Sequence, residues 1–198
     1  MKLPTISEAL RYLMGAACAT ALLASAQGMP SQGAPMSGTT SANKAGIMDM
    51  DSMVRDGFLR DVSSRAQMEM ETSQLALTKS SNDGIKQLAQ QVVQDYHQFG
   101  ADLVAVAKVH NTALPTSLPG RFKKSEKKLQ ALGGSAFDQE YLSQLKRDVN
   151  SDQKQAKQSE HAMDDAALQK FAVGVQTSAE NRLHQIEDVA KSANLNLK

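Results

Sequence analysis

Four histidines are the side chains of this sequence best suited to binding a metal ion: His97, His110, His161 and His184. A di-iron site inside a helical bundle uses Glu-x-x-His pairs, because residues i and i+3 of a helix project to the same side. The residues three positions before these histidines are Gln94, Ala107, Gln158 and Asn181, and none of them is a glutamate. The spacing therefore does not predict a di-iron site, although Glu180 and His184 are four residues apart and could share a helix face.

Five methionines lie close together in the sequence, at Met48, Met50, Met53, Met68 and Met70. Thioethers are soft ligands that suit Cu(I), so a copper-handling segment is one interpretation. Methionine also fills gaps in helical cores, and no histidine or cysteine accompanies this group. We favour the core interpretation, and the sequence predicts no cofactor.

The sequence contains no Gly-rich phosphate loop, no nucleophile elbow and no zinc-protease motif. Asp148 and Asp152 are four residues apart and share one face of a predicted helix. Acids with this spacing are common on solvated helix surfaces, so we expect both side chains to be solvated. These observations predict a non-enzymatic protein.

The formal net charge of the 198-residue chain is +1, and its acidic and basic residues are interspersed. Nucleic-acid binding would need a basic stripe or a strongly basic domain, so that class is excluded. Aromatic residues make up 4% of the chain and tryptophan is absent. A core of Leu, Val, Ile, Ala and Met suits packing between helices better than packing between sheets.

The first 26 residues have the pattern of a secretory signal peptide. Lys2 and Arg11 give a positive start, residues 12–23 are apolar, and Ala24-Ser25-Ala26 forms a small-x-small cleavage site. We predict cleavage after Ala26, a periplasmic product and no transmembrane segment in the mature chain. Lipid attachment at Cys18, the only cysteine, is the less favoured alternative, because Gly15 stands where lipoprotein signals usually carry leucine.

Two further segments are predicted after the signal peptide. Residues 27–52 are rich in Gly, Ser, Pro, Thr and Ala and predict a flexible leader without a core. Residues 53–195 show apolar residues at three-and-four spacing, which predicts a bundle of four amphipathic helices. The predicted long helices are 54–79, 83–110, 135–163 and 165–193, with a short extra helix at 125–132. Their predicted N-caps are Ser81 or Asp83, Ser135, and Asp164 or Asp165.

The middle of the third and fourth predicted helices is polar. Between Leu145 and Met163 the only substantial apolar side chain is Val149, beside two alanines. Between Val175 and Ile186 the inward face must include some of Ser178, Ala179, Arg182 and Leu183. Buried polar groups must be paired, so two interpretations are open. The first is a binding or metal layer inside the bundle. The second, which we favour, is a solvated stretch where the helices separate, or a seam of satisfied hydrogen bonds.

Short motifs spread along the chain resemble a known family. They are Leu75-Ala76, Ile85-Lys86-Gln87-Leu88-Ala89 with Val93-Gln94-Asp95, Phe137-Asp138 with Tyr141, and Leu168-Gln169-Lys170-Phe171-Ala172, in order and at fitting spacing. They look like the DUF4142 family of exported bacterial proteins, over about residues 56–193. The resemblance implies an all-α, ferritin-like four-helix bundle and an envelope location.

The resemblance also implies where members of that family carry metal-binding side chains. A histidine commonly follows an aspartate in the second and third helices, another lies in the fourth, and a glutamate lies in the first. In this chain the glutamate is Glu69, whereas the histidine positions hold Tyr96, Val149 and Asn181 or Arg182. Valine cannot bind a metal and arginine would repel one, so the set is lost. The weak candidates that remain for a metal are Glu69, Asp95 and His97.

The sequence thus favours an exported, non-enzymatic helical bundle that works by contact with an unknown envelope protein or with itself. The alternative is a degenerate ferritin-like bundle that still binds iron, manganese or copper, or acts in redox or stress responses.

Overall fold

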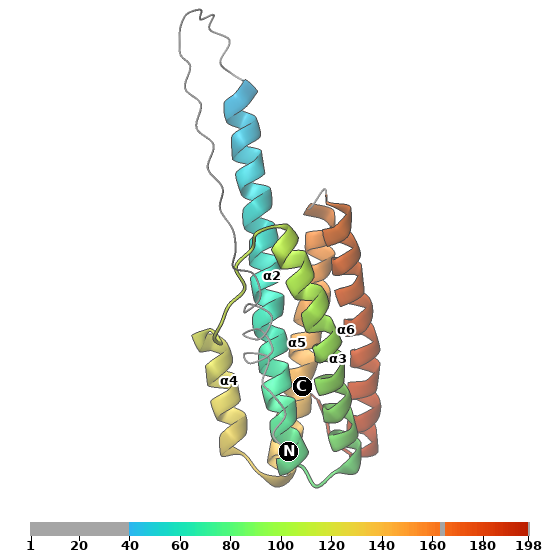
Figure 1. Cartoon of the computed structure of the whole chain (residues 1–198). Coiled ribbons are helices and arrows are strands. Elements are labelled where there is room, and N and C mark those ends of the chain that lie inside the picture. Colours follow the sequence, from blue (N-terminus) through green and yellow to red (C-terminus); the bar gives the residue numbers. More distant parts are fainter. Residues whose placement is uncertain (1–39, 163–164, 198) are drawn as a thin grey trace, which may run out of the picture. The chain divides into compact units, whose positions relative to one another are not determined.

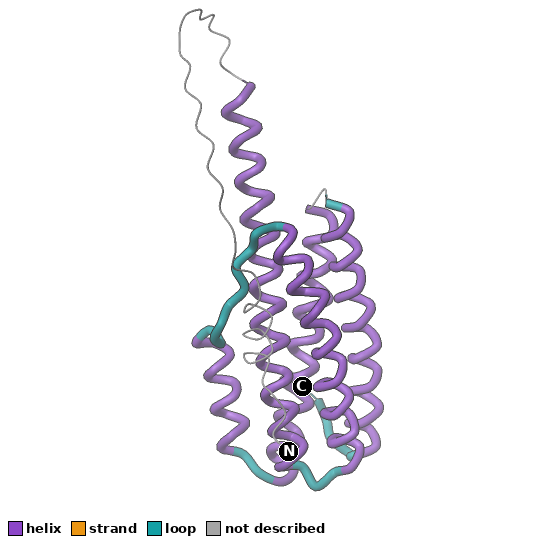
Figure 2. The backbone as a smooth tube through the Cα atoms, in the orientation of Figure 1, coloured by secondary structure: helices purple, strands orange, loops and turns teal. Residues whose placement is uncertain are grey.

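The computed structural model describes residues 40–162 and 165–197 (Figures 1 and 2). The predicted signal peptide, Cys18 and residues 27–39 of the predicted leader lie outside the described residues. Every regular element in the described ranges is an α-helix. The helices are α2 (Thr40–Lys79), α3 (Asp83–Val109), α4 (Gly120–Ala131), α5 (Gly134–Ala162) and α6 (Ala166–Ser192).

The chain divides after Met50 into two units, and the bundle belongs to residues 51–198. The described residues of the first unit, 40–50, are helical and begin α2. Residues 40–52 of the predicted flexible leader are therefore helical. Once a helix has nucleated, each added residue gains one hydrogen bond, and this segment contains Ala, Met and Lys but no proline.

Four long helices lie side by side within residues 51–198, and α4 runs beside them (Figure 1). Helix α6 packs along α5 and against α3, and α4 packs against α5. The all-α four-helix bundle with a short extra helix between its second and third members is thus confirmed. No helix in the described ranges has both the length and the apolar character needed to cross a bilayer.

Local signals in the sequence set most of the helix ends. The Asn82 side chain, rather than Ser81 or Asp83, caps α3 by accepting a hydrogen bond of 3.1 Å from the Ile85 N–H. The predicted cap Asp165 is confirmed, because it accepts a hydrogen bond of 2.8 Å from the Leu168 N–H. Helix α3 ends at Val109, one residue before the predicted end, with His110 as its C-cap, and Asn111 follows with a φ of 55°.

Two predicted starts are wrong. Helix α4 begins at Gly120, directly after Pro119, and not at Ser125, because proline fits the start of a helix, where its missing N–H is not needed. Helix α5 begins at Gly134, which has a φ of +56°, so Ser135 lies inside the helix and does not cap it. Glycine tolerates that left-handed conformation, which is how the chain turns sharply between α4 and α5.

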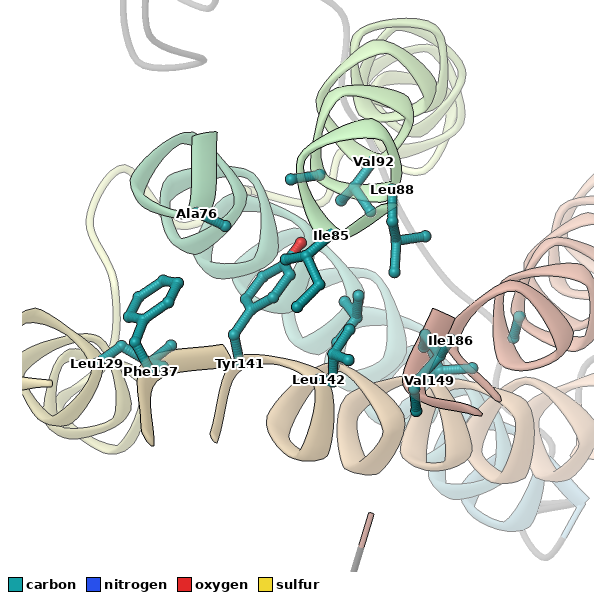
Figure 3. Close-up of a cluster of buried hydrophobic side chains, with 14 residues drawn as sticks. Ala76, Ile85, Leu88, Val92, Leu129, Phe137, Tyr141, Leu142, Val149 and Ile186 are labelled. Carbon is teal, nitrogen blue, oxygen red and sulfur yellow. The ribbon is translucent and has the colours of Figure 1, made fainter. Parts of the chain in front are cut away.

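The apolar core consists of two clusters along the bundle. The first is drawn in Figure 3, where Tyr141 and Leu142 point from α5 toward α2 and α3, and Phe137 lies beside Leu129 of α4. The second surrounds Phe58, Leu103, Leu168 and Val175. On α2, Phe58, Val62, Ala66 and Ala76 are buried, whereas Leu75 is only partly buried.

Of the methionines considered for copper, Met53, Met68 and Met70 belong to residues 51–198, and they differ in burial. Met68 and Met70 are buried, and Met68 packs with Leu118, just before α4, and with Phe122 of α4. The Gln144 amide donates a hydrogen bond of 3.2 Å to the Met68 sulfur. Met53 is exposed on α2. Met68 and Met70 therefore act as core side chains, as expected.

Candidate functional site

A layer of charged side chains lies between the two apolar clusters. On α2, Arg65 and Glu69 are buried between Val62 of the second cluster and Ala76 of the first. On α5, Asp152 is buried between Val149 and Ala156 in the same way. The layer is therefore a continuous part of the bundle interior and not a surface feature.

Helical spacing places these charges inside the bundle. In three helices, the buried residues recur at intervals of three, four or seven, which places them on one face of each helix. They are residues 58, 62, 65, 69 and 76 of α2, residues 145, 149, 152 and 156 of α5, and residues 175, 179, 182 and 186 of α6. Asp152 and Arg182 thus occupy core positions of otherwise apolar stripes. Of the four inward candidates on α6, Ala179 and Arg182 are buried, Leu183 is partly buried and Ser178 is exposed.

Glu69 is the most deeply buried acid of the layer, with only 1% of its surface exposed. The Tyr96 hydroxyl of α3 donates a hydrogen bond to Glu69 Oε2, whereas Oε1 has no hydrogen-bond partner among the described residues. Burial raises the pKa of Glu69 well above its usual range, and the nearby Asp152 and Asp148 carboxylates raise it further. The environment of Glu69 therefore favours its protonated form.

Arg65 forms an ion pair with Asp152, and its Nη2 donates a hydrogen bond of 2.8 Å to Gln155 Oε1. Burial raises the pKa of Asp152 to about 6 and that of Asp148 to about 7, although Arg65 opposes both shifts. Asp148 is partly buried one turn away on the same helix. The expectation that these two acids are solvated is therefore wrong, because α5 turns them toward the bundle interior.

Arg182 of α6 is the second cation of the layer and is 7% exposed. Its Nη2 donates a hydrogen bond of 2.7 Å to Asp95 Oδ2 on α3, whose side chain remains partly exposed. Its Nη1 is buried and has no hydrogen-bond partner among the described residues. One half of the guanidinium group is therefore held in place, while the other half has an unused donor.

A cavity of about 340 Å³ opens beside this arginine, between α3, α5 and α6. Its apolar wall includes Val62 of α2, Val149 of α5 and Val175 of α6. Its polar wall includes the buried Asp152 and Arg182 and the exposed side chains of Asp95, Ser178, Asn181 and Gln185. Tyr96, Phe99 and Ala179 complete it. The exposed polar residues lie where the cavity meets solvent.

The three candidate metal ligands have different surroundings. Glu69 is bonded to Tyr96, Asp95 is paired with Arg182, and His97 lies on the exposed side of α3. In the described part of the chain, no three His, Cys, Asp or Glu side chains are grouped so that they could hold a metal ion. The charged side chains of the layer are instead engaged in hydrogen bonds and ion pairs with one another.

The family resemblance identified several residues of this cavity, although their side chains are not metal ligands here. The positions at which it implies histidine, namely Tyr96, Val149, Asn181 and Arg182, come from three helices and all line the cavity. Sequence reasoning named these positions one by one, but missed Arg65 and Asp152 as members of the site. The signal for Asp152 was available, because it fills the gap in the inward series Leu145, Val149 and Ala156.

Comparisons with known proteins bear on the fold and the family. A crystal structure of a Streptomyces coelicolor protein, described as secreted and as DUF305, matches with a TM-score of 0.61 and 18% sequence identity. The match covers 72% of this chain and 93% of that one, and at this identity it shows the fold alone. No curated protein sequence matches the chain. The domain of unknown function DUF4142 matches residues 39–189, which is more than half of the sequence, so the chain belongs to the DUF4142 family.

Proposed function

We propose that this chain is an exported, non-enzymatic binding protein of the cell envelope, and that it holds a small polar organic molecule in the cavity between α3, α5 and α6. One observation carries the proposal: two almost fully buried charged side chains, Arg182 and Asp152, line a cavity whose other walls are largely apolar. The signal-peptide pattern of residues 1–26 supports export, and so does the likeness to a protein described as secreted.

The lining of the cavity suits a small organic ligand, because a few fixed polar groups beside apolar walls can orient such a molecule. A cavity of about 340 Å³ is at the small end of the range for organic ligands. The carboxyls with raised pKa values in and behind the wall are also typical of functional sites.

The experiment is native mass spectrometry of the chain after export by a bacterial host and incubation with a mixture of amino acids, organic acids, amines and sugars. We expect one compound to bind with 1:1 stoichiometry. Ser178→Phe should abolish binding, because residue 178 is exposed at the cavity and a larger side chain can fill it without disturbing the core. Thr177→Phe is the matched control, since Thr177 is the exposed neighbour that does not line the cavity.

Two results would contradict the proposal. In the first, no compound of the mixture binds to the unmodified protein. In the second, a compound binds equally well to the Ser178→Phe variant, which would place its site elsewhere. Iron, manganese or copper retained at 1:1 stoichiometry after purification without added metal would instead support the metal-binding alternative.

A second candidate function, contact with another protein, is favoured by exposed apolar side chains at one end of the bundle. Met53 at the start of the bundle part of α2 is 69% exposed, and Val109 at the end of α3 is 71% exposed. The Thr112 hydroxyl donates a hydrogen bond of 2.6 Å to Asp56 Oδ1, so the two helix ends lie at the same end of the bundle. Met53 and Val54 also line an open groove of about 420 Å³ between α2 and α5.

Sedimentation velocity tests this candidate for association between copies of the chain. If the apolar end is the interface, Met53→Glu should shift the protein toward the monomer, whereas Ala101→Glu, on an exposed part of α3, should not. A monomer at all concentrations would rule out self-association.

A further inference from the structure

Helix α4 carries a dense group of positive charges on the side that faces away from the bundle. Its residues include one acid, Glu126, and five cations, which are Arg121, Lys123, Lys124, Lys127 and Lys128. The helix therefore has a net charge of +4, whereas the whole chain has a net charge of +1. The positive charge of the protein is thus concentrated on one short helix, and the rest of the chain is net acidic.

Helical spacing separates these cations from the buried face of α4. Phe122 and Leu129 are buried, and they share one face because they are seven residues apart. With about 100° of rotation per residue, the five cations cover an arc of about 160° on the opposite side. All five side chains are exposed, and α4 lies on the outside of the bundle (Figure 1). We call this arc the cationic face of α4.

Two cations of the cationic face have partners on neighbouring helices. Arg121 forms an ion pair with Asp61 of α2, and Lys128 Nζ lies 2.8 Å from Glu140 Oε2 of α5. Both pairs lie along one edge of the arc. The other three cations have no ion-pair partner among the described residues, and they are Lys123, Lys124 and Lys127. The centre and the second edge of the face therefore present uncompensated charge to solvent.

This distribution of charge works against the stability of α4. Like charges three or four residues apart on a helix repel each other, and the cationic face contains four such pairs. They are Arg121–Lys124, Lys123–Lys127, Lys124–Lys127 and Lys124–Lys128. The first turn of α4 contains no acid, so Arg121 and Lys123 also lie near the positive end of the helix dipole. An anionic surface against this face would offset both unfavourable effects.

We propose that the cationic face of α4 binds the anionic headgroup surface of a phospholipid bilayer. Groups of about four to eight lysines and arginines on an amphipathic helix are typical of proteins that bind anionic lipids. Lysine is a point charge on a long flexible stem, so it suits phosphate groups whose positions vary. The long stems also allow both edges of the arc to reach a flat surface.

Two other classes of partner fit this face less well. Protein interfaces are depleted in lysine and enriched in arginine and aromatic residues, whereas the three unpaired cations are all lysines. Proteins that bind single-stranded nucleic acid add aromatic side chains for stacking, and the only aromatic residue of α4, Phe122, is buried. The cationic face therefore fits a layer of lipid phosphates best.

The contact with the bilayer is electrostatic. The large exposed apolar side chains of the described residues all lie outside α4, and they are Met53, Val54, Val109 and Val173. Helix α4 thus has no large apolar side chain that could insert between the lipids. Binding should consequently depend strongly on salt, because no apolar burial supports it.

Co-sedimentation of the full exported chain with lipid vesicles tests the proposal. One set of vesicles contains equal amounts of phosphatidylglycerol and phosphatidylcholine, and the other contains phosphatidylcholine alone. We expect the mixed vesicles to bind the protein and the neutral vesicles to leave it in solution. Raising the salt from about 0.1 M to about 1 M shortens the screening length from about 10 Å to about 3 Å and should abolish binding.

A triple variant assigns the contact to α4, namely Lys123→Gln, Lys124→Gln and Lys127→Gln together. Each lysine close to an anionic bilayer raises the affinity about fivefold, so this variant should bind the mixed vesicles at least tenfold more weakly. Circular dichroism should show a Tm that is unchanged or higher, because the substitutions remove like-charge pairs without touching the buried face.

The matched control removes the same charge from other helices. It combines Lys154→Gln, Lys157→Gln and Lys170→Gln, at exposed lysines of α5 and α6. We expect this control to bind the mixed vesicles within about threefold of the unmodified protein, since these lysines lie outside the cationic face.

Four results would overturn the proposal. The unmodified protein could fail to bind the mixed vesicles at low salt, or the control could lose as much affinity as the α4 variant. Inorganic phosphate could release the protein where sodium chloride of equal ionic strength does not, which would indicate a site for free phosphate. A DNA duplex could displace the vesicles at a lower phosphate concentration than that of the lipids, which would assign the face to nucleic acid. The cavity takes no part in this contact, so its proposed function is tested separately.

Discussion

The raised pKa values of the buried acids in the mid-bundle layer make the free energy of unfolding depend on pH. The pKa values of Asp148 and Asp152 rise on folding from an ordinary 3.8 to about 7 and about 6. The folded state therefore keeps protons that the unfolded state has already released. This contribution to stability is complete below about pH 4, and it is lost as the pH rises through 6 and 7. We predict that the protein is more stable at pH 5 than at pH 7.

The magnitude follows from the two pKa values. Each pH unit in which the folded state holds one extra proton lowers the free energy of unfolding by about 1.4 kcal/mol. Between pH 5 and 7, Asp148 alone would give roughly 2–3 kcal/mol and Asp152 roughly half of that. The two groups repel each other, so their contributions do not add fully, and we expect a total of about 3 kcal/mol. For a domain of this size that corresponds to a fall in Tm of about 6–12 °C.

Other titrating acids do not reverse the sign in this window. The pKa of Asp56, despite its partial burial, is lowered by its hydrogen bond with Thr112 and by arginines, and that of Glu140 by Lys128 and Arg147. Their stabilising contributions are lost only as the pH falls below about 4. The pKa of Glu69 is raised, so it contributes with the same sign as Asp148.

Calorimetric melting at pH 5, 6 and 7 measures the effect, and Asp148→Asn tests its origin. The amide is neutral at every pH and mimics the protonated acid, so this variant should lose more than half of the pH dependence. Asp102→Asn, at an exposed aspartate of α3, should melt with the pH dependence of the unmodified protein. A Tm that rises from pH 5 to 7, or a variant with unchanged pH dependence, would refute the assignment of raised pKa values to the layer.

Three further predictions concern stability. Leu142→Ala, at a fully buried side chain, should lower the free energy of unfolding by about 2–5 kcal/mol in denaturant titration, whereas Val109→Ala, at an exposed site, should change it by less than about 0.5 kcal/mol. Tyr96→Phe removes the hydrogen bond to the buried Glu69 and should cost about 1–3 kcal/mol at neutral pH; an unchanged Tm would show that the bond contributes nothing. Asn82→Ala removes the cap of α3 and should cost about 1 kcal/mol by the same titration, and a neutral result would argue against the cap.

Much of the architecture could be predicted because it depends on local signals. The three-and-four spacing of apolar residues predicted the long helices, and Asp165 predicted the start of α6, since its side chain caps a helix by a contact three residues away. The errors at the starts of α4 and α5 were also local. There, Pro119 and Gly134 determined the boundary more strongly than Ser125 or Ser135.

The site could be predicted only in part. A polar stretch in the third and fourth long helices was visible in the sequence, but its interpretation remained open between solvated and buried. Spacing within one helix says which residues share a face, but not how closely the facing helices approach. Asp152 was therefore assigned to solvent, although Arg65 on α2 holds it inside the bundle.

The amino-acid sequence alone determined that four amphipathic helices pair their apolar faces, because helical periodicity and apolar burial are encoded within each segment. Tertiary structure decided which charges meet across the bundle: Glu69 with Tyr96, and Arg182 with Asp95. These pairs join residues 27 and 87 positions apart in the chain. The raised pKa values of Glu69 and Tyr96 arise from burial between helices, which no single segment contains.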